Sequence, residues 1–77
     1  MNTLIDTPQS AKHSGGMITV VMESGFEFSF PCESYTRLAA ASDAERDHIE
    51  LSPLGLHWPD IDEDLSILGL QRDHVKR

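Results

Sequence analysis

The chain has little cysteine, no long apolar run and no export signal. Its single cysteine, Cys32, cannot form an internal disulfide or build a zinc site alone, which favours a reducing cytoplasm as its compartment. No apolar stretch approaches the roughly 20 residues of a transmembrane helix, and the N-terminus lacks the basic and apolar regions of a signal peptide. We therefore expect an unexported protein that does not bind membranes.

Positive charge is also scarce. Six Lys and Arg stand against 13 Asp and Glu, a net charge of −7. Because binding to phosphate backbones requires clustered basic residues, we expect no direct contact with nucleic acid. The glycine-rich loops that hold nucleotide phosphates are absent too. The acids gather in residues 43–64, where eight of them stand against Arg46 alone. This distribution predicts a basic protein partner.

With 77 residues and 39% hydrophobic content, the chain is expected to form one small α+β domain. Residues 1–16 are predicted to be a flexible leader, 17–70 the domain and 71–77 a polar tail. Leu4 and Ile5 offer a short edge strand as an alternative within the leader. The predicted order is β-β-α-β-β-α, a small antiparallel sheet with one main helix and a short C-terminal helix.

Alternation of apolar and polar residues predicts the first hairpin. Residues 17–22 place Ile18, Val20 and Met22 on one face, and residues 26–30 alternate three phenylalanines with Glu27 and Ser29. The turn between them contains Gly25, which can take a positive φ. Residues 32–41 have helical spacing, and the sequence from Ser42 to Glu45 matches a capping box that begins a second short helix near residue 43.

The stretch from Leu54 to Leu70 organises the second half. Leu54, Leu56 and Trp58 alternate as in a strand with one buried face, and Pro59 ends that strand. This pattern favours Trp58 as a core residue over a surface anchor. Asp62 is the expected N-cap of a C-terminal helix, whose Leu65 and Leu68, with Ile61, are expected to pack on Trp58.

No residue is predicted to be catalytic, and no metal or cofactor is expected. Asp60, Asp62 and Asp64 begin like a calcium loop, but Leu65 and Gln71 stand where that loop needs Gly and Glu. His48 and His57 could approach each other across a hairpin. Two interpretations therefore stand: a transition-metal or acid/base site, and two structural histidines, of which the second is simpler. Cys32 is interpreted as a packing residue rather than a nucleophile.

The stretch SYTRLAAASDAERDHIELSPLGLHWPDIDEDLSILGL resembles the bacterial family catalogued as domain of unknown function 2442, most specifically in H-W-P-x-x-D-E-D. The match runs through Arg37, Leu38, Ala41, Arg46, His57, Trp58, Pro59, Asp62, Glu63, Asp64, Ser66 and Leu70. The resemblance implies a small α+β domain with a curled antiparallel sheet and an antitoxin-type protein that stands beside a toxin. Some members of that family also carry a DNA-binding helix-turn-helix domain. We expect 77 residues to be too few for such an added domain.

We therefore expect a non-catalytic, antitoxin-like module that captures a small basic toxin or another nucleic-acid-acting protein. The predicted partner-binding residues are the carboxylates Asp60, Asp62, Glu63, Asp64, Asp43, Asp47 and Glu50. The alternative is a phage- or plasmid-encoded inhibitor of the anti-CRISPR type, whose acids mimic DNA phosphates. An exposed strand edge would also permit a homodimer.

Overall fold

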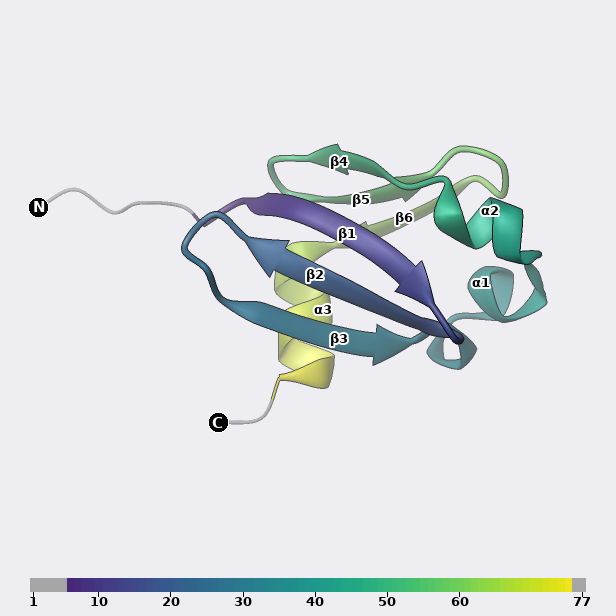
Figure 1. Cartoon of the computed structure of the whole chain (residues 1–77), viewed down its shortest axis with the longest axis horizontal. Helices are drawn as coiled ribbons and strands as arrows, with labels where there is room; N and C mark the ends of the chain where they lie inside the picture. Colours follow the sequence, from purple (N-terminus) through teal and green to yellow (C-terminus); the bar gives the residue numbers. More distant parts are fainter. Residues whose placement is uncertain (1–5, 76–77) are drawn as a thin grey trace, which may run out of the picture.

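The computed structural model describes residues 6–75, which form an α+β domain with two three-stranded antiparallel sheets (Figure 1). The strands of the first sheet are β1 (Pro8–Ser14), β2 (Met17–Met22) and β3 (Glu27–Pro31). A short 3₁₀ helix, η1 (Cys32–Ser34), and the helices α1 (Thr36–Ala40) and α2 (Asp43–Asp47) follow. The second sheet contains β4 (Glu50–Ser52), β5 (Gly55–Trp58) and β6 (Glu63–Ser66), and leads into α3 (Ile67–His74).

The predicted α+β class is confirmed, but the element order is β-β-β-α-α-β-β-β-α. The two additional strands are β1 and β6. Strand β1 of the first sheet contacts β4 of the second. Helix α3, which lies behind β2 and β3 in Figure 1, packs against β3, β5 and β6. Within residues 6–75, no helix is long and apolar enough to cross a membrane.

Strand β1 lies inside the segment 1–16 that was expected to be a leader. Ser14 pairs with Met17, so a two-residue turn of Gly15 and Gly16 joins β1 to β2. Both glycines have positive φ, 56° and 79°, as a tight primed hairpin turn requires. The leader prediction thus extended too far, because the glycine pair forms a turn of the sheet. The edge strand considered for Leu4 and Ile5 falls outside the described residues.

The predicted hairpin of β2 and β3 is confirmed. Ile18 pairs with Phe30 and Val20 pairs with Phe28, and all four side chains are buried. Phe26 lies before β3 and is exposed, so the core face of β3 has two phenylalanines instead of three.

The predicted helix over residues 32–41 is interrupted at Tyr35, whose φ of −130° and ψ of 124° are extended. The extended backbone separates η1 from α1, and the Tyr35 ring packs edge to face on Phe30 with centroids 5.7 Å apart. Helix α2 begins as predicted. Ser42 Oγ accepts a hydrogen bond from the Glu45 N–H, and the Glu45 carboxylate accepts one from the Ser42 N–H at 2.9 Å.

The predicted N-cap at Asp62 is wrong. Residues 63–66 pair with β5, and α3 starts four residues later, with Ser66 Oγ accepting a hydrogen bond from the Gly69 N–H at 3.0 Å. Asp62 instead has a φ of 52° in the β5–β6 turn, a conformation that Asp tolerates better than most residues. The later start also turns Leu68 to solvent, and α3 extends to His74 within the expected tail.

Trp58 lies fully buried at the centre of the core, as predicted. Its indole Nε1–H donates to the Arg46 carbonyl at 3.1 Å, and the Arg46 guanidinium donates to the carbonyls of Leu38 and Ala39. These bonds satisfy carbonyls near the end of α1 and tie both short helices to β5. The core consists of Ile18, Val20, Met22, Phe28, Phe30, Cys32, Leu38, Leu56, Trp58, Ile67 and Leu70.

Candidate functional site

Two of the predicted partner-binding acids meet on the outward side of the second sheet. Glu50 of β4 stands opposite His57 of β5, and His57 stands opposite Asp64 of β6, so the three residues form one row across the sheet. Side chains on a strand alternate between faces, and the neighbouring Leu56 and Trp58 point into the core. The row of Glu50, His57 and Asp64 is called the acidic sheet face below.

His57 and Asp64 share the shortest of the three histidine–aspartate hydrogen bonds described below. The His57 Nδ1–H donates to Asp64 Oδ1 at 2.6 Å. This bond is the largest effect and raises the pKa of His57 above its ordinary 6.5. Burial, the next largest effect, lowers the pKa, and the negative charges of Asp64 and Glu50 raise it by smaller amounts. Protonation of His57 therefore places a positive charge between two carboxylates.

A second row on the same face runs through Ser52, Gly55 and Ser66. A Cβ atom at Gly55 would lie 2.7 Å from the Leu65 carbonyl oxygen, so close strand packing excludes a side chain there. The outward face of the second sheet is consequently polar, with carboxylates at one row and small groups at the other.

Two more predicted acids bind histidines elsewhere. Asp60, after β5, accepts from His48 Nδ1 at 2.9 Å, and Asp47 of α2 accepts from His13 Nδ1 of β1 at 2.8 Å. The His13 ring is bonded at both nitrogens, because its Nε2 also accepts a hydrogen bond from the Gly16 N–H. The sequence left open an approach of His48 to His57 beside a structural role for each, and in the structure each histidine bonds to its own aspartate.

The remaining three predicted acids do not join the acidic sheet face. Asp43 is exposed in the first turn of α2, and the Asp62 carbonyl accepts a hydrogen bond from the Arg37 guanidinium. Glu63 pairs with Trp58 and so lies on the opposite side of β6 from Asp64. The seven predicted residues are thus distributed over several surfaces, and Glu50 with Asp64 makes the only cross-strand carboxylate row in the described second sheet.

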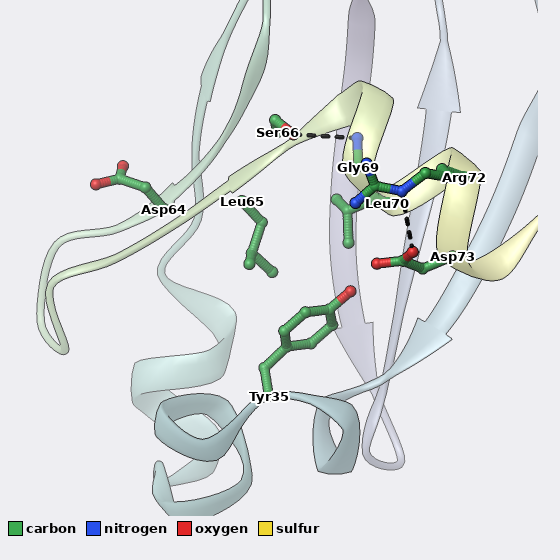
Figure 2. A pocket seen from close by; sticks show the side chains of 8 residues that line it. All are labelled: Tyr35, Asp64, Leu65, Ser66, Gly69, Leu70, Arg72 and Asp73. Atoms are coloured by element: carbon green, nitrogen blue, oxygen red, sulfur yellow. Dashed lines mark hydrogen bonds and ion pairs between the residues drawn. The ribbon is translucent and has the colours of Figure 1, made fainter.

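A cavity that the sequence did not indicate opens beside Asp64 (Figure 2). It has a volume of about 260 Å³ and is lined by Tyr35, Asp64, Leu65, Ser66, Gly69, Leu70, Arg72 and Asp73. The Tyr35 ring reaches towards α3, where Arg72 Nε donates to Asp73 Oδ1 at 3.3 Å. Arg72 and Asp73 belong to the segment 71–77 that was expected to be a tail, and no pattern in that segment indicated a site.

Hydrogen bonds join residues that line this cavity to each other and to His74. The Tyr35 hydroxyl and His74 Nε2 share a hydrogen bond of 2.8 Å. Burial raises the pKa of Tyr35, and the carboxylates of Asp73 and Glu63 raise it further while Arg72 lowers it. The hydroxyl therefore stays protonated at neutral pH.

Neither the cysteine nor the histidines and acids of the described residues form a reactive thiol or a metal-binding cluster. Cys32 is fully buried, and burial raises the pKa of its thiol above the ordinary value although the Arg46 charge opposes this. A buried, protonated thiol is a packing group. Among residues 6–75, no group of three or more His, Cys, Asp and Glu is arranged to hold a metal ion.

Comparison with known proteins gives a family and a related structure. A family model described as protein of unknown function (DUF2442) matches residues 8–74. A crystal structure of a protein of unknown function from Rhodospirillum rubrum is similar over 94% of this chain and 92% of that chain, with a TM-score of 0.82 and 29% sequence identity. No curated protein matches the sequence.

Proposed function

The chain belongs to the family of proteins of unknown function DUF2442, and we propose that it is a non-catalytic, antitoxin-like module that captures a small basic protein. The observation that carries the proposal is the acidic sheet face. It presents Glu50 and Asp64, both exposed, on the outward side of the second sheet. We place this activity in the cytoplasm, because the one cysteine is a free thiol.

Charge gives this face its proposed role in capture. The net charge of −7 attracts a basic protein over several ångströms and speeds its encounter. Lysine or arginine side chains of the partner would then bond to Glu50 and Asp64, as charge-assisted hydrogen bonds. A toxin that binds nucleic acid through such basic residues would lose access to its target.

The histidine in the row makes the proposed capture depend on pH. Because the pKa of His57 is raised above 6.5, the ring gains its proton at a higher pH than an isolated histidine. The resulting positive charge opposes a basic partner at the centre of the face. We expect the affinity to fall as pH decreases through the pKa of His57 and to be greatest above it.

The experiment compares three forms of the full chain as bait in extracts of the native host. The first is the wild type, and the second is Glu50→Lys with Asp64→Lys. The matched control is Glu23→Lys with Glu27→Lys, which changes the net charge equally at exposed positions near the β2–β3 turn. Captured proteins are identified by mass spectrometry, and amide NMR spectra check that each bait is folded.

The proposal expects one small basic protein to bind the wild type and the control but not the Glu50/Asp64 variant. Equal capture by all three folded baits would reject the acidic sheet face. Capture of a multisubunit nucleoprotein effector instead would favour the alternative function, an inhibitor of the anti-CRISPR type whose carboxylates mimic DNA.

A further inference from the structure

An apolar groove lies beside the acidic sheet face. It has a volume of about 510 Å³ and is formed by the β4–β5 turn, the end of β6 and the first turn of α3. Its lining residues are Asp6, Pro53, Leu54, Ser66, Ile67, Leu68 and Gln71. Leu54 and Leu68 are 67% and 79% exposed, more than any other large hydrophobic residue in the described part of the chain. Such exposure at one place costs solubility and marks an interaction surface.

The groove is held open by the backbone of the fold. The Ile67 N–H donates to the Leu54 carbonyl at 2.9 Å, which fixes the β4–β5 turn against the start of α3. The Ser66 cap sets the rotation of α3, so that Ile67 and Leu70 enter the core and Leu68 faces out. The backbone of both exposed leucines is therefore fixed by hydrogen bonds. A ligand that binds there loses little free energy to ordering of the groove.

The groove and the acidic sheet face are continuous through β6. Ser66 lines the groove, and Asp64 lies two residues earlier on the same side of the strand. Two residues of a strand span about 6.6 Å. On an α-helix, side chains three or four residues apart lie about 5–6 Å from each other. One helix of a partner is able to place an apolar side chain in the groove and a basic one at Asp64.

We propose that the groove and the acidic sheet face are one composite docking site for a basic amphipathic helix of the partner. This inference rests on the proposed function and specifies the segment that is captured. Charge selects the occupant: a second copy of this chain brings another net charge of −7, whereas a basic helix neutralises Glu50 and Asp64. A leucine, isoleucine or phenylalanine of the helix would contact Leu54 and Leu68.

The test uses synthetic peptides and the isotope-labelled full chain. The probe is a 14-residue amphipathic helix of leucine and lysine. One control peptide replaces each lysine by glutamate, and the other replaces each leucine by serine. Binding is followed by chemical-shift changes of the backbone amides. We expect the leucine–lysine peptide to shift Leu54, Leu68 and Asp64, and each control to bind at least about tenfold more weakly.

Variants of the protein separate the groove from the acidic sheet face. Leu68→Ser removes an exposed side chain and leaves the core intact, and it should weaken the leucine–lysine peptide about tenfold. Met17→Ser is the matched control, because Met17 is also exposed but lies at the β1–β2 turn, the opposite end of β1 from Asp6. This control should bind the peptide as the wild type does.

Each contrary result has one meaning. If Leu68→Ser binds the peptide as the wild type does, the groove is not part of the docking site. The proposed function would still stand if Glu50→Lys with Asp64→Lys abolished capture of the basic protein. Equal binding of the glutamate peptide would overturn the selection by charge. If the amide chemical shifts of Leu54 and Leu68 change with protein concentration in the absence of peptide, the groove binds a second copy of this chain instead. Peptide binding only after deletion of residues 2–5 would assign the groove to the chain itself.

Discussion

Replacement of Trp58 by alanine should remove a large part of the stability of the domain. The side chain is fully buried, and a Trp→Ala change in a core costs about 3–5 kcal/mol. At about 0.05–0.15 kcal/mol per residue, a domain of this size has a free energy of unfolding of about 4–12 kcal/mol. Loss of Trp58 is therefore expected to leave the chain marginally folded or unfolded.

A conservative change divides that cost into packing and hydrogen bonding. Trp58→Phe keeps a buried ring but leaves the Arg46 carbonyl without its indole donor, which should cost about 1–3 kcal/mol. Urea unfolding followed by far-UV circular dichroism measures both variants, because the chain has no other tryptophan to report fluorescence. Leu54→Ala, at an exposed position, is the control and should change stability by less than about 0.5 kcal/mol. A Trp58→Ala variant within about 1 kcal/mol of the wild type would refute the central role of Trp58 in the core.

Three further predictions follow from single contacts. An NMR titration should give His57 a pKa above 6.5, and Asp64→Asn should lower that pKa. A raised pKa stabilises the folded state fully below pH 6.5, and this contribution is lost as the pH rises through the folded-state pKa. Between pH 6.5 and the folded-state pKa of His57, the wild type should therefore lose more stability than Asp64→Asn. An unchanged titration would show that Asp64 is not the cause. Gly55→Ala should lower the melting temperature, because its Cβ would meet the Leu65 carbonyl, and a variant as stable as the wild type would contradict that packing. Cys32 should react with a thiol reagent far more slowly in the folded chain than in denaturant, and equal rates would mean that the thiol is accessible.

The parts of the fold that sequence predicted correctly depend on local patterns. Alternation identified β2 and β3, and the Ser42 capping box identified α2. Strand β1 was missed because its polar residues, among them Lys12 and His13, do not alternate with apolar ones. The pair of Gly15 and Gly16 was the available signal, since two positive φ angles in succession are typical of a hairpin turn.

Strand β6 was missed because acidic residues are rare in strands and common in the first turn of a helix. Asp62 and Ser66 are both good N-caps, and local preference does not choose between them. Pairing with β5 decides the outcome, since it places Leu65 beside Leu56 and extends the sheet to Ser66. This strand pairing then fixes which face of α3 is buried.

The candidate site shows the same limit. Glu63 and Asp64 are adjacent in sequence but point to opposite sides of β6, whereas Glu50 and Asp64 come together across three strands. Several residues of the family motif are explained by architecture, because Trp58 anchors the core, Arg46 binds the carbonyls of α1, and Ser66 caps α3. The density of acidic residues along the sequence therefore did not indicate which of those residues share one surface.

The most direct test of the proposed function is the affinity of the captured basic protein for the folded Glu50→Lys, Asp64→Lys variant, measured beside the Glu23→Lys, Glu27→Lys control by calorimetry at two salt concentrations. We predict that the first variant loses binding and that the control keeps it, with affinity for the wild type falling as salt rises. Equal affinities for both variants would contradict the assignment of the acidic sheet face as the binding surface.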